Sequence, residues 1–142
     1  MEQTSIFKLI HTIELMNNEN IKRFTRKFPY PLGISPILVL AELRTKGPQK
    51  QAKLAETLGY TKGAMTSIAA KLVKLELAER LYDETDRRTV QMVITKAGKE
   101  ALKDAHEIGK DVFIDLFKVL NEEEIKQYLH IQEKLVSGIQ DH

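Results

Sequence analysis

The hydrophobic pattern of this chain changes period just after Leu77, and this change constrains the fold more than any other feature. Up to that point apolar residues recur at steps of three and four, which is typical of amphipathic helices. Beyond it, Val90, Met92 and Ile94 fall on alternate positions, as in a strand with one buried face. The polar segment 83–89 separates this strand from a shorter one before it. The sequence therefore predicts helices followed directly by a β-hairpin.

Two helices are predicted first, one over residues 6–28 and one ending near Lys46. A Pro-Tyr-Pro triplet ends the first helix, because proline lacks an amide hydrogen and disfavours helix in the residue before it. Ser35 is predicted to cap the second helix, with Pro36 at its first position, where a missing amide hydrogen costs nothing. A Gly-Pro pair then stops this helix.

Two shorter helices follow, at about 51–58 and 62–75. Gly59 lies just past the first of them, where the chain commonly adopts a left-handed conformation that glycine tolerates best. Thr61 is predicted to cap the second. Two short helices joined by a tight turn with a glycine form a helix-turn-helix, which we place at about 51–75.

Two longer helices are predicted after the hairpin. Thr95 is expected to cap the first of them, which runs to about Val119. Asn121 and Glu124 then form a variant capping box, with three carboxylates near the positive end of the last helix.

The terminal helical segments, residues 5–28 and 99–140, carry more apolar surface than a core over residues 30–98 can cover. We therefore expect residues 5–28 and 108–140 of two chains to interlock in a two-fold homodimer. The alternative is that these helices fold back on their own chain. The predicted fold is one domain over residues 1–142, mainly α-helical with a small β-hairpin, in which the terminal helices form a dimerisation frame.

The composition excludes several function classes. The chain has no cysteine, which excludes disulfides, a cysteine-based zinc site and a thiolate switch, and favours a reducing compartment. No apolar run is long enough to span a membrane, so we expect no membrane partner. A glycine-rich phosphate loop and a serine in a nucleophile elbow are also absent. We therefore expect neither an enzyme nor a cofactor.

Charge is distributed unevenly along the chain, although its net value is only +2. Residues 1–47 hold seven Lys/Arg and four Asp/Glu, and residues 48–98 hold nine and six. Residues 99–142 reverse this balance, with six basic and ten acidic residues. This separation favours an anionic partner that binds the first two thirds of the chain.

One face of the helix predicted at 62–75 carries positive charge and no negative charge. Lysine can bond guanine or phosphate, and serine and threonine can bond bases or phosphate oxygens, so this face fits the major groove of DNA. A mildly basic face is also common on surface helices in general. We call the following set the recognition face: Lys62, Gly63, Thr66, Ser67, Ala70, Lys71 and Lys74.

The polar loop of the hairpin ends in two arginines, Arg87 and Arg88. If the loop projects beyond the helix-turn-helix, these guanidinium groups can enter a neighbouring minor groove, where narrow A·T-rich stretches concentrate negative potential. Asp86 is close enough in sequence to brace Arg88. The alternative is a solvated turn in which Asp83, Glu84 or Asp86 pairs with the arginines.

Five motifs follow one another in a characteristic order and spacing: Gly33-Ile34-Ser35, Leu54-Ala55 with Leu58-Gly59, Ala64-Met65-Thr66 through Leu72, Asp83 to Arg88, and Ile94-Thr95-Lys96-Ala97-Gly98. Their order and spacing resemble the multiple-antibiotic-resistance regulator (MarR) family of bacterial transcription factors. The resemblance covers nearly the whole chain, and its most specific part is the Asp-Arg-Arg loop followed by the Ile-Thr-x-x-Gly junction.

This resemblance implies a winged helix-turn-helix homodimer that binds a pseudo-palindromic operator. The helices at 62–75 would enter successive major grooves and the wings, at about 80–94, would enter adjacent minor grooves. It places Lys62, Thr66, Ser67 and Lys71 on the recognition surface, Arg88 on the wing, and Asp86 as the residue that steadies this arginine.

Two residues depart from the family pattern. Lys50 stands where the family often has a serine or threonine cap for the third helix, and we expect it to contact phosphate instead, at a cost of about 1 kcal/mol. Glu76 stands where a glycine often ends the recognition helix, which leaves the end of that helix open.

The resemblance also implies a ligand-responsive repressor that acts in the bacterial cytoplasm, binds double-stranded DNA and responds to a small lipophilic or phenolic effector. Two alternatives remain open. One is a winged-helix module that docks proteins without binding DNA. The other is a metal-responsive regulator, for which His11, His106 with Glu107, and His130 are scattered and lack the spacing of a helical zinc site, so we expect no metal.

Overall fold

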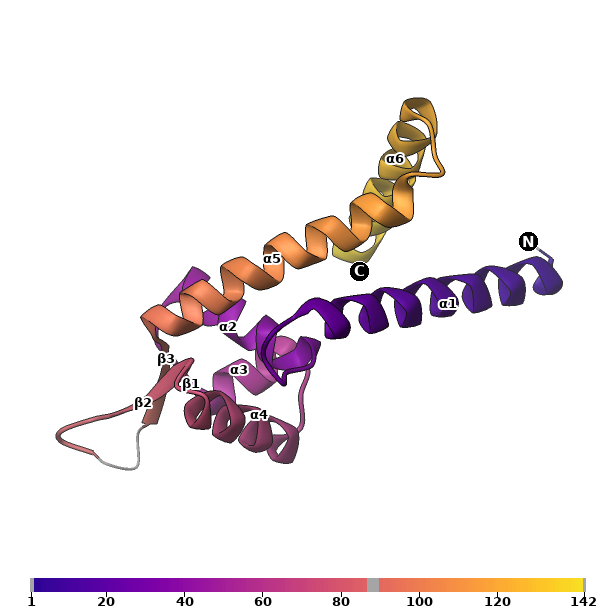
Figure 1. The fold of residues 1–142 in the computed structure, drawn as a ribbon. Coiled ribbons are helices and arrows are strands. Elements are labelled where there is room, and N and C mark those ends of the chain that lie inside the picture. The colour runs from indigo at the N-terminus through magenta and orange to yellow at the C-terminus, as the bar shows by residue number, and fades with distance from the viewer. Residues whose placement is uncertain (1, 87–89, 142) are drawn as a thin grey trace. The chain divides into compact units, whose positions relative to one another are not determined.

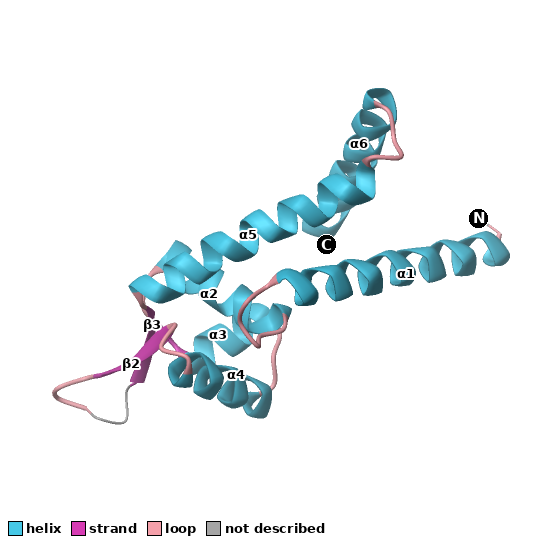
Figure 2. Ribbon diagram, viewed as in Figure 1, coloured by secondary structure: helices cyan, strands magenta, loops and turns pink. Residues whose placement is uncertain are grey.

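The computed structural model describes residues 2–86 and 90–141 and confirms a mainly helical fold with a small antiparallel sheet (Figures 1 and 2). The chain divides into two compact units, one up to Gly109 and one from Lys110 onward. In chain order the elements are α1 (Gln3–Lys27), α2 (Ile34–Lys46), β1 (Gln49–Lys50), α3 (Gln51–Leu58), α4 (Lys62–Lys74), β2 (Ala78–Tyr82), β3 (Val90–Ile94), α5 (Lys96–Phe117) and α6 (Glu122–Gln140).

The sheet has three strands in the order β1-β3-β2, all antiparallel. The predicted hairpin is β2 paired with β3, and Arg80 lies opposite Met92 in its register. Met92 is fully buried, which confirms the alternating pattern seen in the sequence. The short strand β1, in which Gln49 also pairs with Met92, was not predicted, because two residues carry no readable period.

The start predicted for α2 is wrong by two residues. Gly33 is the N-cap, and the helix begins at Ile34, so Ser35 lies inside it rather than at the cap. Pro36 is tolerated there because the first four amide groups of a helix have no partner within the helix. The predicted stop is confirmed, since Gly47 is the C-cap and has a φ of +81°.

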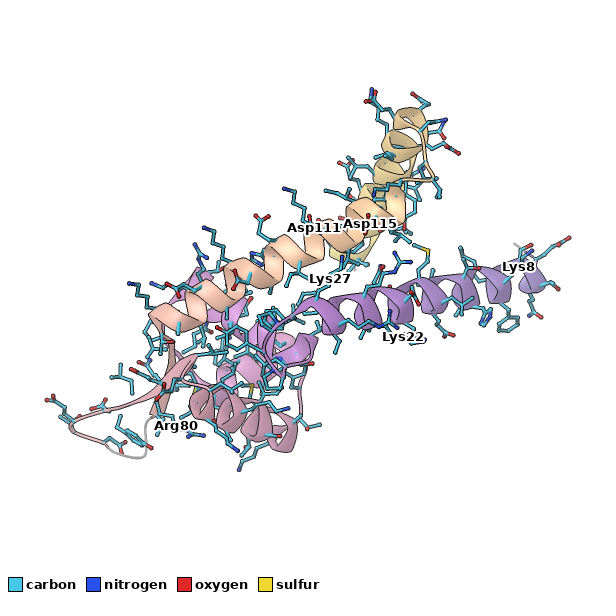
Figure 3. The ribbon with its side chains drawn as sticks, viewed as in Figure 1. Lys8, Lys22, Lys27, Arg80, Asp111 and Asp115 are labelled. Atoms are coloured by element: carbon cyan, nitrogen blue, oxygen red, sulfur yellow. The ribbon has the colours of Figure 1, made fainter. Side chains whose placement is uncertain are left out.

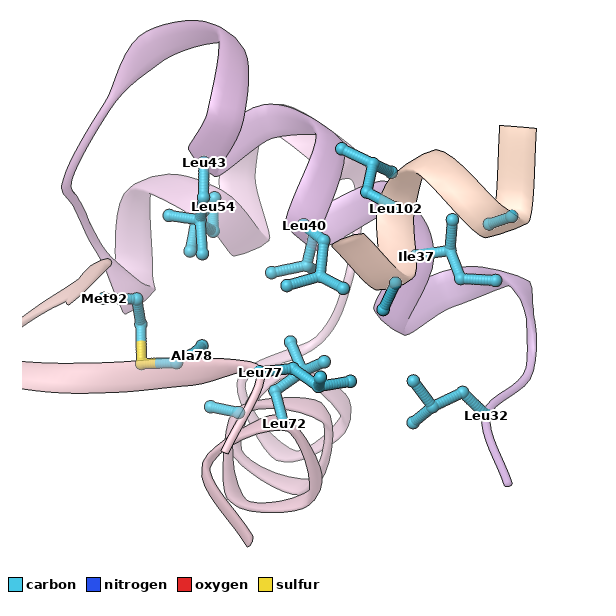
Figure 4. Packing of buried hydrophobic residues seen from close by; sticks show 14 of the residues in the cluster. Leu32, Ile37, Leu40, Leu43, Leu54, Leu72, Leu77, Ala78, Met92 and Leu102 are labelled. Carbon is cyan, nitrogen blue, oxygen red and sulfur yellow. The ribbon is translucent and has the colours of Figure 1, made fainter. Parts of the chain in front are cut away.

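The core lies where α2, the helix-turn-helix and the sheet meet. Leu40 and Leu43 of α2, Leu54 of α3, Leu72 of α4 and Met92 of β3 are all at most 1% exposed (Figure 4). Further contributions come from the start of α5, where Ala101 and Leu102 are buried in the same cluster. The helix-turn-helix is thus held on a closed apolar core, so its outer surface has a fixed backbone.

The terminal helices contrast with this core. Among the described residues, neither α1 nor α6 has a single buried side chain, although both are amphipathic. Within the second unit, the rings of Phe117 and Tyr128 lie 5.7 Å apart, and Asn121 and Glu124 form the predicted capping box. None of the described helices is both long enough and apolar enough to cross a membrane.

Candidate nucleic-acid interface

The helix α4 presents its polar side to solvent as the sequence predicts. Thr61 caps the helix by accepting a hydrogen bond from the Ala64 amide at 3.1 Å. Met65, Ala69 and Leu72 are buried against the core, which fixes the rotation of the helix about its axis. All seven residues of the recognition face are exposed as a result: Lys62, Gly63, Thr66, Ser67, Ala70, Lys71 and Lys74.

The end of α4 is a Schellman motif built on a non-glycine residue. The Glu76 amide donates to the Val73 carbonyl oxygen at 3.0 Å, and the Leu77 amide donates to the Leu72 carbonyl oxygen at 3.0 Å. Glu76 has a φ of +61°, and among the described residues no other non-glycine residue has a positive φ. The helix therefore ends as sharply as it would with the glycine that the family pattern favours.

We expect Glu76→Gly to stabilise the protein by about 0.5–1 kcal/mol, because the left-handed conformation costs a residue with a Cβ more than the extra chain entropy costs glycine. Gly59 has a similar conformation at the end of α3, with a φ of +75° and no atom within 4 Å of a Cβ built on it. Gly59→Ala is the matched variant and should have the opposite sign. Urea denaturation measures both, and equal signs would contradict the assignment of strain to Glu76.

A single threonine fastens the end of α4 to the start of α5. Thr95 Oγ1 donates to the Glu76 carbonyl oxygen at 2.7 Å and accepts from the Gly98 amide at 3.0 Å. The Thr95 amide also donates to the Leu77 carbonyl oxygen at 3.1 Å. Thr95 is thus the predicted cap of α5, and its hydroxyl also holds the end of the recognition helix in place.

Charge on α4 is only partly explained by helix stability. Lys71 and Lys74 lie in the last turn, where a positive charge is favourable near the negative end of the helix dipole. Lys62 is the first residue of the helix, and the first turn holds no acidic side chain. Its charge therefore opposes the dipole, and an anionic partner outside the chain would compensate for it.

The hydroxyl of Thr66 has partners within the protein. It donates to the Lys62 carbonyl oxygen at 2.8 Å and accepts from Gln51 Nε2 at 3.2 Å. Gln51 is the first residue of α3, and reasoning from the sequence did not select it. Periodicity identifies the exposed face of one helix but does not reveal which side chain of a neighbouring helix reaches it.

The polar loop of the hairpin begins with a turn organised by Asp83. Its Oδ1 atom accepts from the Thr85 hydroxyl at 2.7 Å, from the Thr85 amide at 2.8 Å and from the Asp86 amide at 3.4 Å. These hydrogen bonds lower the pKa of Asp83, and the bond from the Thr85 hydroxyl has the largest effect. An Asp two residues before a Thr is a known turn signal, and Asp83 was nevertheless not predicted to organise the loop, a role expected only of Asp86.

The two predicted wing arginines, Arg87 and Arg88, lie outside the described residues. A third arginine, Arg80, comes from β2 and lies at the base of the hairpin beside α4 (Figure 3). It lines an open groove of about 850 Å³ with residues of α4, β2 and the start of α5. Arg80 was missed because it lies between exposed residues of an edge strand. No motif or alternating pattern in the sequence therefore distinguishes its position.

Lys50 is the N-cap of α3, and its side chain makes no capping hydrogen bond. It is exposed at the end of β1, opposite Gln91. The structure therefore agrees with the departure from the family pattern, because Lys50 occupies the cap position without capping the helix. The start of α3 lacks a side-chain cap and carries a positive charge instead.

Among the residues that the structure describes, no three His, Asp or Glu side chains gather closely enough to hold a metal ion.

Comparison with known proteins identifies a family. Residues 34–90 match the family model described as MarR family.

Relatives and solved structures agree with this match. The chain is 32% identical, over 84% of its length, to an uncharacterised HTH-type transcriptional regulator of Bacillus cereus, of which 76% is covered. It is 29% identical, over 75% of its length, to the HTH-type transcriptional repressor MdtR of Bacillus subtilis, of which 70% is covered. Its fold is similar to that of a mutant MarR from E. coli complexed with operator DNA, with a TM-score of 0.74, 22% identity, and coverage of 95% of this chain and 99% of that one.

Proposed function

Because this chain belongs to the MarR family of DNA-binding transcription regulators, we propose that it is a homodimeric repressor that binds a pseudo-palindromic operator and is released by a small effector. Because bacterial promoter DNA lies in the cytoplasm, the protein would act there. The observation that carries the proposal is the recognition face, whose residues are all exposed on a helix packed against the core, and which bears three lysines and no carboxylate. Phosphates and guanine edges are the acceptors that such a face matches.

In this proposal Ser67, Lys71 and Lys74 contact the major groove, and Lys50 and Lys62 contact the DNA backbone beside it. The wing supplies Arg87 and Arg88 to the minor groove, with Asp86 steadying Arg88. The two recognition helices of the dimer must then lie roughly 34–36 Å apart, one turn of DNA. Repression needs no further contact, because a dimer bound over a promoter blocks access to it.

The direct test of function is binding to the DNA upstream of the gene that encodes the chain, followed over a range of salt concentrations. We expect affinity to fall steeply with salt, since each lysine or arginine on a phosphate releases counterions. A flat salt response, or no binding, would favour the alternative, a winged helix that docks proteins. Such a docking module does not require a set of lysines on α4 without carboxylates on the same face, so this face favours DNA binding.

Lys62→Ala is expected to change stability and DNA affinity in opposite directions. Removing a positive charge from the start of α4 should stabilise the protein by about 0.5 kcal/mol, because that charge opposes the helix dipole. Losing one phosphate contact in each half of the dimer should reduce the slope of log affinity against log salt by about 2. Thermal denaturation and fluorescence anisotropy measure the two effects, and a loss of both stability and affinity would contradict this role of Lys62.

We further propose that the exposed apolar sides of α1 and α6 are the dimer interface. Leu135 of α6 is 58% exposed and Ile13 of α1 is 47% exposed in the single chain, and both belong to apolar faces of amphipathic helices. Such faces are usually covered in a soluble protein. The family resemblance supports the same assignment.

Leu135→Asp should convert the dimer to monomer at micromolar concentration, because it would bury a carboxylate in an apolar interface. Ser137→Asp adds the same charge two positions further along α6, on its polar side, and should leave the dimer intact. Sedimentation velocity separates the two species. A wild-type monomer at micromolar concentration would contradict the dimer itself.

The effector is proposed from the family resemblance to be small and lipophilic, often phenolic. A ligand releases the operator only if it binds the DNA-free form better than the bound form. Titrating simple phenolic acids into the preformed protein–DNA complex tests this, with loss of the anisotropy signal as the expected result. An unchanged complex at millimolar concentration of every compound would argue against a phenolic effector.

A further inference from the structure

Thr66 belongs to the recognition face, yet its hydroxyl hydrogen is already used. The hydroxyl has one hydrogen and two lone pairs. The hydrogen is donated to the Lys62 carbonyl oxygen at 2.8 Å, and one lone pair accepts the Gln51 side-chain amide at 3.2 Å. Phosphate oxygens are acceptors only. Thr66 therefore has no hydrogen to donate to a phosphate unless its bond within the helix is broken.

The opposite holds for Gln51. Its side chain has two amide hydrogens and a carbonyl oxygen, and only one of these hydrogens is given to Thr66. Within the described part of the chain, the second hydrogen and the carbonyl oxygen make no hydrogen bond. The side chain is thus held in one orientation and still has a donor to offer.

The surroundings of Gln51 leave this donor without a competing partner in the protein. Gln51 and Lys62 line a hollow of about 450 Å³ between α3 and α4, and the rest of its wall is formed by Ala52, Ala55 and Met65. These three side chains offer no oxygen or nitrogen. Gln51 and Lys62, a residue of the recognition face, therefore line the same largely apolar hollow.

We propose that Gln51 donates its remaining amide hydrogen to a DNA phosphate oxygen, and that Thr66 is the positioning residue that holds it there. The proposal rests on the DNA-binding function proposed above. The first helix of a helix-turn-helix crosses the DNA backbone, while the second enters the major groove, so α3 is the helix from which a phosphate contact is expected. Thr66 then contributes to affinity through Gln51 rather than by touching DNA.

The test is a double-mutant cycle measured by fluorescence anisotropy with a labelled duplex from the upstream DNA and with a scrambled duplex. Gln51→Ala should weaken binding to both duplexes by a similar factor of about 10, because phosphate contacts carry no sequence information and are made twice in a dimer. Its salt slope should match that of the wild type, since the amide is neutral and displaces no counterion.

The Thr66 variants of the cycle show whether Thr66 positions Gln51 or contacts DNA itself. Thr66→Val keeps the shape and removes the hydroxyl, so it should weaken binding about as much as Gln51→Ala, and the double variant should be no weaker than either single variant. Thr66→Ser retains the hydroxyl and should restore affinity. Thermal melting confirms that each variant is folded, which we expect because Thr66 is exposed and Gln51 is only half-buried.

Three results would overturn the proposal. Affinity unchanged by Gln51→Ala would exclude the contact. Additive losses in the double variant would show that Thr66 touches DNA itself, and a loss confined to the upstream duplex would show that Gln51 contacts a base. Failure of the wild type to bind either duplex is a different outcome, because it removes the DNA-binding function on which the inference rests.

Discussion

Replacing Gly98 by alanine is expected to destabilise the protein by about 3 kcal/mol, because the new methyl group has no space and its nearest neighbour is backbone. A Cβ atom on Gly98 would overlap the Leu77 carbonyl oxygen and lie 2.8 Å from Ile94 Cγ1 and 3.0 Å from the Leu77 carbonyl carbon. The Leu77 carbonyl also accepts the Thr95 amide, so it cannot withdraw without loss of that bond. Separation of α5 from the end of α4 would be required.

Thermal unfolding at fixed protein concentration measures this effect, and we expect the midpoint to fall by about 10 °C for a chain of this size. Gly109→Ala is the matched control in the same helix. Nothing lies within 4 Å of a Cβ built on Gly109, so alanine should stabilise α5 there by about 0.5–1 kcal/mol. If both variants changed the midpoint equally, close packing at Gly98 would not be the cause.

Replacing Arg88 by alanine should have the largest effect on DNA affinity. An arginine inserted in a groove contributes roughly 1–3 kcal/mol, and a dimer loses this contribution twice, so the expected loss is about 2–6 kcal/mol. The physical reason is the strong negative potential of a narrow minor groove, which a guanidinium group matches in charge and in flat shape. Anisotropy titration with the upstream duplex measures the loss.

Arg44→Ala provides the control, because Arg44 is an exposed arginine near the end of α2 and its loss changes the net charge equally. Arg88→Lys adds a further distinction. It keeps the charge and removes the planar donor group, so it should recover only part of the affinity if the arginine binds within the groove. Equal affinities for Arg88→Ala and Arg44→Ala would remove the wing from the mechanism.

Much of the recognition face and its surroundings could be predicted from the sequence, because these features depend on local signals. The alternation of buried and exposed residues on α4 follows from its apolar spacing, and the caps at Thr61 and Thr95 follow from residue type and position. The hairpin followed from the change of period. In each case a signal within a few residues determines the local structure, and the core only selects which face is covered.

Features that depend on contacts between distant segments could not be predicted in this way. The hydrogen bond from Gln51 to Thr66 spans 15 residues, and that from Thr95 to Glu76 spans 19. The left-handed conformation of Glu76 opposes its own preference and persists because the surrounding hydrogen bonds and the buried Leu72 and Leu77 require it. The cap at Gly33 was missed for a different reason, since Ser35 has the better intrinsic propensity for an N-cap.

The hydroxyl of Thr95 has a consequence for how such a regulator can be switched. Because one oxygen atom bonds both Glu76, just past the end of α4, and the first turn of α5, we expect the recognition helix and the start of α5 to move together. A signal that reaches α5 would therefore shift or rotate the helix that binds DNA, and would not melt it. Hydrogen exchange of the amides of α4 should be equally slow in the state that binds DNA and in the state released from it. The two states would then differ in the spacing of two intact helices and not in how much of the chain is folded.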